Sequence, residues 1–456
     1  MFQKKKGIIL FTLLIATLLS PLDFYIVNLA LTSIQKGLDA TSAHLQMIVS
    51  FYTCAYAVFQ ITGGRLGDIF GRRIMFLVGL MGFTLASFIC GIATIPATII
   101  TARVIQGASG AVMAPQILAI IHITFTEKEK TKVMALYSFT FGIAAVLGQY
   151  LGGTLISHSL WGLGWRIIFL MNVPIGLVAW FIAVWMLPRD KKTVKETVDI
   201  AGIILLSLTL GLVIYPLTLV SETGWNNSAI GMLLGSILLF LSFIGYEKEL
   251  MRKGKTPLIN MSVFRYKNLS IGSIIAFLFY CSGIFYLGLG IYLQEGLHWS
   301  AADAGSAMVP FGLAFLFSSV TSPYIVRKIG DYILITGLLC YALGFVFIIY
   351  SISTPYSTTY LFIGLFMSGC GMGMTLSSIV RISMSGIATH FAGLASGVIN
   401  CALQIGSAIG VAGIGSIFFT LGRENGYNYS FRLSLWILIT LIVVASSLTL
   451  LITKKK

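Results

Sequence analysis

The sequence predicts an all-α polytopic membrane protein that crosses the bilayer fourteen times, with both termini in the cytoplasm. Of its 456 residues, 57% are hydrophobic and only 10% are charged, with a mean hydropathy of +0.93. A soluble protein needs far more polar surface than this. Apolar segments long enough to cross a bilayer core of about 30 Å recur along the chain. Most basic residues fall in alternate connections between these segments, the pattern that sets orientation.

The apolar segments define the predicted spans, each of them helical because a backbone in lipid must satisfy its own hydrogen bonds. The first span follows the basic stretch MFQKKK and superficially resembles a signal peptide. It is too long and lacks a small-residue cleavage site, so we expect it to remain in the mature protein. The spans are predicted at residues 7–31, 45–66, 74–94, 97–123, 133–157, 165–187, 200–221, 229–246, 269–294, 304–326, 332–352, 359–380, 391–419 and 433–453.

The distribution of Lys and Arg gives the orientation. With the N-terminus placed inside, the cytoplasmic segments carry 25 of the 30 basic residues, and Arg103 lies within a span. Only Lys36, Arg166, Arg423 and Arg432 remain outside. This asymmetry predicts that both termini are cytoplasmic. Contact of the basic loops with anionic lipid also explains the formal net charge of +15 without a nucleic-acid partner.

Two long polar stretches, at 187–199 and 246–268, divide the chain. They predict a six-span bundle over 1–190, two extra spans with their linkers over 191–267, and a second six-span bundle over 268–456. Transporters often carry such internal repeats. A weak repeat is visible, because GGRLGDIFGRRIM follows span 2 and SPYIVRKIGDYIL follows its counterpart, span 10.

Enzymatic and metal-binding chemistry find no support in the sequence. The six cysteines all fall inside predicted spans, where they serve as small apolar packing residues. Neither a metal-ligand spacing nor a nucleotide-binding loop of the G-x-x-x-x-G-K-[ST] kind is present. We therefore expect no catalytic residues, no metal, no cofactor and no direct use of ATP.

The stretch GGRLGDIFGRR after span 2 carries a family resemblance. It resembles the loop motif of the major facilitator superfamily, G-x-L-x-D-x-x-G-R-K/R, with Gly64, Asp68, Gly71, Arg72 and Arg73 in the motif positions. Glycines there permit a tight turn and close approach of helices. The aspartate can pair with arginines or cap a helix. The resemblance implies a gate on the cytoplasmic side.

Further blocks narrow the resemblance to the fourteen-span drug:proton antiporters. LDFYIVNLAL (22–31) is similar to the span-1 signature of that group, and WRIIFLMNVPIG (165–176) is similar to its span-6 signature. RVIQGASGAVMAP (103–115) resembles the span-4 motif R-x-x-x-Q-G with a shifted spacing. YLQ at 292–294, VPFGLA at 309–314 and GLASGVIN at 393–400 also fit, so the resemblance covers nearly the whole chain.

One further block, LGQYLGG (147–153), resembles the span-5 antiporter motif G-P-x-x-G-G. Gly148, Gly152 and Gly153 supply its glycines, while Gln149 stands where the family usually has proline. A proline would kink the span. Glutamine instead brings an amide that can hydrogen-bond across a helix interface. Helix packing and a direct gating role both remain open for these glycines.

The resemblance implies an exporter in the bacterial plasma membrane that couples inward proton flow to outward movement of hydrophobic, often cationic drugs. Alternating access between the two six-span bundles would carry the compounds. We expect small-molecule drugs, protons and lipids as partners, and a monomer. Two alternatives stay open: a dedicated proton-driven exporter of one endogenous lipid, siderophore or metabolite, and a membrane receptor or scaffold that transports nothing.

Substrate selectivity is predicted from a few side chains. Aromatic rings can hold planar or cationic compounds, although each ring can equally well contact lipid or a neighbouring helix. Amides are stronger candidates, because they are poorly tolerated against lipid. Predicted span 10 carries no acid, which favours monocationic or zwitterionic substrates over dications. The residues predicted to line a substrate cavity are Asn28, Tyr56, Gln60, Gln294, Phe311, Asn400 and Gln404.

Asp23 is a carboxylate inside the first span. It lies about 8 residues, roughly 12 Å, below the outer end of span 1, and Arg103 lies roughly 9 Å below the outer end of span 4. The two therefore fall in one layer of the first bundle. Desolvation disfavours a buried charge and a nearby guanidinium favours it, so the pair is suited to proton exchange. We expect Asp23 to carry the proton and Arg103 to tune it, with a purely structural ion pair as the alternative.

Overall fold

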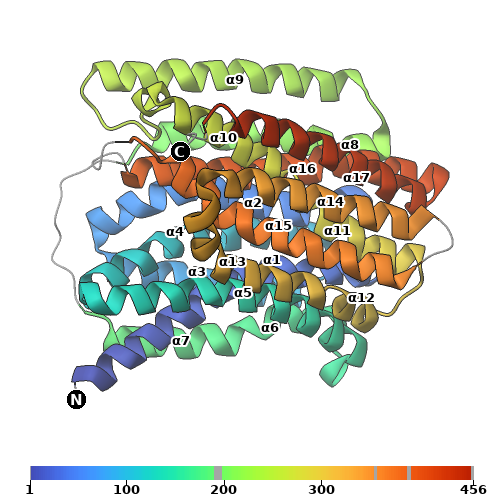
Figure 1. The fold of residues 1–456 in the computed structure, drawn as a ribbon, viewed down its shortest axis with the longest axis horizontal. Coiled ribbons are helices and arrows are strands. Elements are labelled where there is room, and N and C mark those ends of the chain that lie inside the picture. The colour runs from blue at the N-terminus through green and yellow to red at the C-terminus, as the bar shows by residue number, and fades with distance from the viewer. Residues whose placement is uncertain (1, 189–197, 354–356, 388–391, 453–456) are drawn as a thin grey trace.

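The computed structural model describes residues 2–188, 198–353, 357–387 and 392–452. Every regular element in these ranges is helical, and the long helices run roughly side by side (Figure 1). The 3₁₀ and π turns are η1 (Leu160–Gly162), η2 (Gly164–Arg166), η3 (Met261–Arg265), η4 (Tyr292–Gly296) and η5 (Gly330–Tyr332). The α-helices are α1 (Phe2–Leu38), α2 (Ser42–Phe70), α3 (Arg72–Ile92), α4 (Pro96–Thr124), α5 (Glu127–His158), α6 (Ile167–Leu170), α7 (Asn172–Met186), α8 (Ile200–Thr223), α9 (Asn227–Arg252), α10 (Lys267–Tyr280), α11 (Gly283–Ile291), α12 (Ala301–Ala307), α13 (Val309–Ile329), α14 (Ile333–Ser353), α15 (Thr358–Ser383), α16 (Ala392–Asn425) and α17 (Tyr427–Thr449).

Thirteen helical stretches in the described part of the chain have the length and apolar character needed to cross a membrane. One of them, Ala301–Ile352, spans 52 residues and contains α12, α13, η5 and α14. It therefore covers two of the predicted spans, 304–326 and 332–352. The chain is thus a multi-span, all-helical membrane protein, as the sequence predicted.

Three predicted spans are interrupted rather than continuous, and the one predicted at 304–326 breaks between α12 and α13. The segment predicted at 165–187 consists of η2, α6 and α7. The segment predicted at 269–294 breaks between α10 and α11 and ends in the π turn η4. Backbone groups freed by such breaks must find other partners, which is possible only where the helix is buried in protein. The stretch Gly283–Ile291 is buried throughout, which meets this condition.

Local sequence explains several helix ends. Thr41 caps α2 by accepting a hydrogen bond from the backbone N–H of His44 at 3.4 Å. Asp199 caps α8 through the N–H of Gly202 at 2.9 Å. Gly71 joins α2 to α3 with φ 98°, a conformation that side chains disfavour. The tight turn predicted for the GGRLGDIFGRR motif is therefore at Gly71.

The helices pack in two groups with a seam between them. Helices α1 to α7 pack against one another, mainly through α1 with α5, α2 with α4, and α3 with both α4 and α7. Helices α10 to α17 form the second group, through α13 and α14 with α15, α16 with α10, and α17 with α14 and α16. The seam runs along α2 with α16 and along α5 with α12 and α13.

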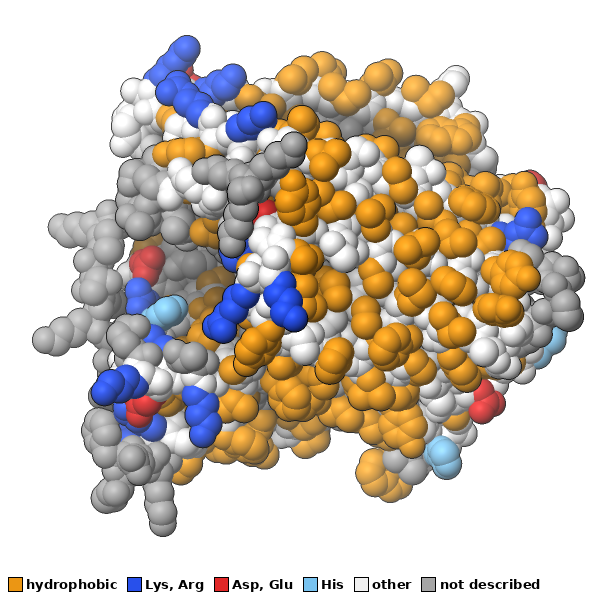
Figure 2. Space-filling view, viewed as in Figure 1, with side chains coloured by type: hydrophobic (Ala, Val, Ile, Leu, Met, Phe, Trp, Pro, Cys, Tyr) orange, Lys and Arg blue, Asp and Glu red, His pale blue; other side chains and the backbone are white. Residues whose placement is uncertain are grey.

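The extra pair of helices lies at one edge of the seam. Helix α8 packs on both α2 and α16, whereas α9 packs mainly on α8 and forms the upper edge of the molecule in Figure 1. Figure 2 shows a broad hydrophobic surface over the middle of the molecule, with Lys and Arg side chains gathered toward the left end. The start of α1 lies toward that basic end. The polar stretch predicted at 187–199 falls largely outside the described residues.

Candidate functional site

The only charged side chains in the middle of α1 and α4 meet in a buried contact. Arg103 donates from Nη1 to Asp23 Oδ2, and the two side chains are 1% and 0% exposed. The carboxylate also accepts from Gln106 Nε2 at 2.9 Å and from Asn172 Nδ2 at 3.3 Å. Gln106 donates in turn to Ser87 Oγ at 2.7 Å. Helices α1, α4 and α7 thus meet at one carboxylate, and α3 joins the network through Ser87.

Arg103 is held on several sides. Its Nε donates to Ile48 O at 3.2 Å, and Nη1 also donates to Gln106 Oε1 at 2.6 Å. Its guanidinium carbon lies 3.9 Å from the centroid of the Tyr52 ring. Removing two charges from water costs several kcal/mol per ion, as an order of magnitude, unless hydrogen bonds complete the pair. This network completes it, so the ion pair is well positioned inside the bundle.

A central cavity adjoins this network on the side of the second helix group. Seven of its eleven described lining residues are aromatic, and none of the eleven is charged. The lining comes from α1, α2 and α5 on one side and α10, α13, α15 and α16 on the other. A compound bound there would touch both helix groups. The lining residues are Ser20, Pro21, Phe24, Tyr25, Tyr52, Tyr56, Phe141, Tyr280, Phe315, Leu376 and Gln404.

Of the residues predicted for the cavity, Tyr56 and Gln404 line it. Phe311 does not. It is 1% exposed and packs edge-on against Tyr286, with ring centroids 5.6 Å apart. Asn28 is not among the lining residues either, and its Nδ2 donates to Phe24 O at 2.7 Å within α1. Helical spacing alone does not distinguish a ring that faces the cavity from one that faces its neighbour.

The other three amides predicted for the cavity, at positions 60, 294 and 400, are not among its lining residues. Asn400 donates to Ser396 O at 3.0 Å in its own helix, and Gln60 Oε1 is buried without a hydrogen-bond partner among the described residues. Gln294 accepts from Thr32 Oγ1 at 2.6 Å and donates to Leu29 O at 3.1 Å. It therefore joins the two helix groups near the end at which α1 finishes.

That end of the seam is closed by several contacts. Lys36 of α1 pairs with Glu295 of η4 at 2.9 Å, and Ser157 Oγ accepts from Ala302 N at 2.9 Å. The hydrogen bonds and ion pairs that the described residues form between 1–188 and 268–452 gather at this Leu38 end. The seam is therefore fastened at one end of the molecule.

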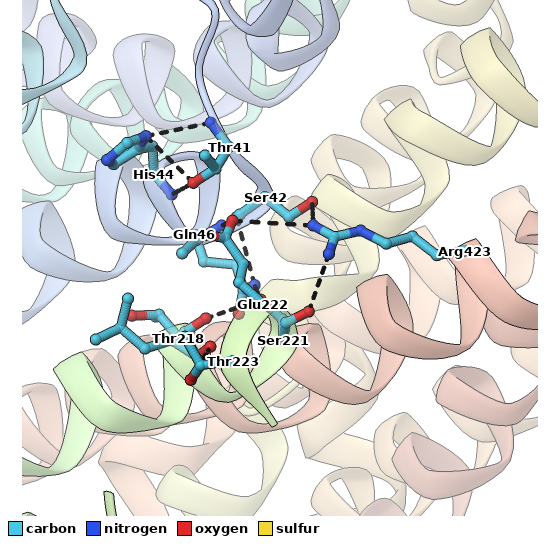
Figure 3. A network of polar contacts seen from close by, with 11 residues as sticks. Thr41, Ser42, His44, Gln46, Thr218, Ser221, Glu222, Thr223 and Arg423 are labelled. Carbon is cyan, nitrogen blue, oxygen red and sulfur yellow. Dashed lines mark hydrogen bonds and ion pairs between the residues drawn. The ribbon is translucent and has the colours of Figure 1, made fainter. Parts of the chain in front are cut away.

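Figure 3 shows a further polar cluster at this end, where α2, α8 and α16 meet. Arg423 donates to Ser42 Oγ at 2.8 Å and to Ser221 O at 3.2 Å. Glu222 accepts from Ala43 N at 2.9 Å. The extra helix α8 is thus joined to both helix groups by side chains.

The GGRLGDIFGRR residues lie at the opposite end. Arg72 Nη2 lies 3.3 Å from Asp68 Oδ1, and both side chains are partly exposed. Arg73 donates to Val184 O of α7. Gly64 has open space beside it.

The close helix approach expected of the motif's glycines lies at neighbouring positions. A Cβ on Gly63 would lie 2.6 Å from Ala111 O, and a Cβ on Gly67 would overlap the Gln116 amide. Helix α2 thus contacts α4 through Gly63 and Gly67, which lie one turn apart on the face toward α4. Gln116 also donates to Gly63 O at 2.6 Å.

The span-5 glycines divide between two interfaces. A Cβ on Gly148 would lie 2.8 Å from Tyr25 Cβ, and one on Gly152 would lie 2.8 Å from Ile26 Cγ1, both in α1. A Cβ on Gly153 would instead overlap Ala301 O of α12. Gln149 is 2% exposed, and its Nε2 has no hydrogen-bond partner among the described residues.

Sequence reasoning missed Asn172 and Ser87 as members of the charged network, and it named Gln106 only as part of a motif. Arg103 and Gln106 are three residues apart and so share a helix face, which was the available signal. Asn172 lies in a predicted span, where an amide is costly against lipid. No pattern in the sequence pairs it with α1.

Comparison with known proteins places this geometry in a family. The family model described as Major Facilitator Superfamily matches residues 13–411. The chain is 34% identical to the "Probable actinorhodin transporter" of Streptomyces coelicolor, over 89% of this chain and 71% of the relative. It is 30% identical to "Multidrug resistance protein Stp" of Mycobacterium tuberculosis, over 87% of this chain and 73% of the relative.

A solved structure of the xylose transporter XylE from E. coli has the same fold, with a TM-score of 0.64 at 14% identity, over 99% of this chain and 100% of that chain. The extent of the family match and the identity to the relatives agree with the fold. The chain therefore belongs to the Major Facilitator Superfamily.

Proposed function

We propose that this protein is a proton-coupled multidrug exporter that moves hydrophobic, monocationic or zwitterionic compounds out of a bacterial cell by alternating access. The observation that carries the proposal is the position of the buried Asp23–Arg103 network directly beside an aromatic cavity shared by both helix groups. An intramembrane carboxylate is functional by default. A cavity that touches both groups suits a compound carried by their relative motion. Relatives named for antibiotic export and multidrug resistance support the same conclusion.

Substrate charge is the first point to test. Because no charged residue is among the described residues lining the cavity, a second positive charge on a compound would find no fixed anion there. Proteoliposomes with an imposed pH gradient should export a monocation about tenfold faster than a dication of the same scaffold. A clear preference for dications would contradict the proposal. Export of a single compound from a broad panel would instead favour the dedicated exporter, the kind of function that a relative named for cephamycin export suggests.

We further propose fourteen spans, with both termini on the cytoplasmic side. The 52-residue stretch Ala301–Ile352 supports the count, because it holds two long helices separated by η5. The gathering of Lys and Arg at one end of the molecule supports the orientation. We also keep the division into bundles at 1–190 and 268–456 with an extra pair at 191–267, the monomeric state, and the absence of a cofactor or nucleic-acid partner.

Introduced cysteines test the orientation. Trp225 lies in the connection between α8 and α9 and is 64% exposed, while Lys253 follows the other end of α9. In intact cells an impermeant thiol reagent should label Trp225→Cys strongly and Lys253→Cys only after permeabilisation. The unsubstituted protein, whose six cysteines are all buried or partly buried, gives the background. Equal labelling of both variants in intact cells would refute the orientation.

For the GGRLGDIFGRR motif we propose a charged latch at the cytoplasmic end. In this structure Asp68 pairs only loosely with Arg72 of the next helix, at the end away from the fastened seam. Asp68→Asn should slow export by about fivefold, since an exposed ion pair contributes up to about 1 kcal/mol. Transport by purified Asp68→Asn protein, normalised to its amount, measures this. Export at the normal rate would contradict the latch hypothesis. The matched control is Glu249→Gln, which removes the acid of an exposed ion pair on α9.

A further inference from the structure

Tyr52 stands between the charged network and the central cavity. The Arg103 guanidinium packs against its ring, with the guanidinium carbon 3.9 Å from the ring centroid. The same residue lines the cavity, together with Ser20 and Phe24 of α1. Tyr52 itself is 3% exposed, so it closes off the network instead of projecting into open space. One side chain thus contacts the ion pair and also borders the cavity in which a compound would bind.

The charge behind this ring depends on Asp23. While Asp23 is ionised, its carboxylate neutralises Arg103 by direct contact. Once Asp23 takes up a proton, the guanidinium keeps its charge and loses its counterion. The other titratable groups that face the pair are the Tyr52 phenol and the Cys90 thiol of α3, and neither supplies a replacement anion while it stays protonated. Ser87, Gln106 and Asn172 complete the surroundings and are uncharged.

Arg103 has little freedom to carry its charge elsewhere. It is 1% exposed, and Ile48 O and Gln106 Oε1 accept hydrogen bonds from it independently of Asp23. The Tyr52 ring also covers one face of the guanidinium, and both side chains are buried. In such a buried layer a charge acts more strongly over a few ångströms than it does in water.

We propose that Tyr52 is the specificity-determining residue through which the protonation of Asp23 discriminates against cations in the cavity and leaves neutral compounds unaffected. This inference rests on the proposed export function. A cationic compound in the cavity and the proton on Asp23 would then compete although they bind to different groups. Each would weaken the binding of the other through the unneutralised charge of Arg103 behind the Tyr52 ring. Neutral aromatic compounds would bind equally well in both states of Asp23, and their movement would be only weakly coupled to protons.

Two probes of similar shape test this with the purified full chain. Tetraphenylphosphonium is a monocation, and triphenylphosphine oxide presents three phenyl rings without a net charge. Dissociation constants are measured for both in acidic and in alkaline buffer. Acid should weaken phosphonium binding by about tenfold, the size expected for two like charges at this range, and should leave oxide binding unchanged. Asp23→Asn should hold phosphonium binding at the weak, acidic value in both buffers.

Two tyrosines of the same helix separate the role of Tyr52 from general packing. Tyr52→Phe keeps the ring and should keep the pH dependence, whereas Tyr52→Ala admits water beside Arg103 and should reduce it to less than about threefold by screening. Tyr56 also lines the cavity, and its ring centroid lies 6.2 Å from that of Tyr52. Tyr56→Ala should weaken both probes and preserve the acid-to-alkaline ratio for phosphonium.

The outcomes are distinguishable. Equal pH dependence for the oxide and the phosphonium in the unmodified protein would overturn the inference without any variant, because the effect would not follow charge. A full pH dependence in Tyr52→Ala would overturn the role of Tyr52 while leaving proton-coupled export intact. Failure of both probes to bind in any buffer would count against the proposed function of the cavity, and the inference would fall with it.

Discussion

Asp23→Asn should abolish proton-driven export, with the rate falling about a hundredfold or more, as expected when a positioned proton-carrying group is lost. The amide resembles the protonated acid in shape, so neutral compounds should still bind normally and monocations should bind with the weakened affinity of the acidic state. The new NH2 group of the amide would replace either the oxygen that accepts from Arg103 or the oxygen that accepts from Gln106 and Asn172. In both cases donors would face a donor, so we expect the free energy of unfolding to fall by about 1–3 kcal/mol. Reconstituted protein with an imposed pH gradient and a thermal unfolding scan measure the two effects separately.

The control for this prediction is the same chemical change at an acid outside the network. Asp303 is exposed and hydrogen-bonds Ser300 near the start of α12. Asp303→Asn should leave export within about twofold of normal, since surface substitutions usually change stability by less than about 0.5 kcal/mol. If Asp23→Asn still concentrates drug using the pH gradient, Asp23 is a structural ion-pair partner and the proton moves elsewhere.

Gly153→Val should unfasten the two helix groups at the Leu38 end. A Cβ there would overlap Ala301 O and lie 3.1 Å from Gly305 Cα, and both are backbone atoms that cannot rotate away. Overpacking of this kind costs roughly 1–3 kcal/mol, enough to shift a two-state balance about tenfold to a hundredfold. We expect export to fall accordingly, because the closed arrangement becomes unfavourable.

Accessibility reports this shift directly. Ser33 lines a second cavity, at the Leu38 end, beside Lys36 and Gln294, and is partly buried. Ser33→Cys should react faster with an impermeant thiol reagent when Gly153→Val is added. Gly152→Ala is the matched control, because its Cβ would meet Ile26 within the first helix group. It should lower thermal stability without changing the reaction rate, and unchanged labelling with Gly153→Val would refute the prediction.

The membrane class and most helix positions could be predicted from the sequence because they depend on local composition. An apolar stretch of sufficient length has few alternatives to a helix in lipid. The interruption between α10 and α11 could not be predicted in this way. No proline marks it, and Ser282 Oγ simply donates back to Phe279 O at 2.7 Å. Such a break depends on burial by neighbouring helices, which composition does not report.

The site was predictable only where chemistry made a residue conspicuous. A carboxylate and a guanidinium inside apolar spans are costly enough to require a partner, so Asp23 and Arg103 could be paired by depth alone. Aromatic residues carry no such requirement. Phe311 and Tyr56 looked equivalent in sequence, yet only Tyr56 lines the cavity, since the choice depends on how the helices rotate about their axes.

The Arg423 cluster has a mechanical consequence. Arg423 of α16 holds Ser42 of α2 and Ser221 of α8, so the rims of the two helix groups are pinned on the α8 side of the seam. Two rigid bodies pinned at one rim open by rotation about the pin, as a hinge does, and not by sliding apart. Each hydrogen bond kept during that rotation saves about 1 kcal/mol that a full separation would cost. The widest opening then falls on the opposite side of the seam, where Gly153 meets Ala301.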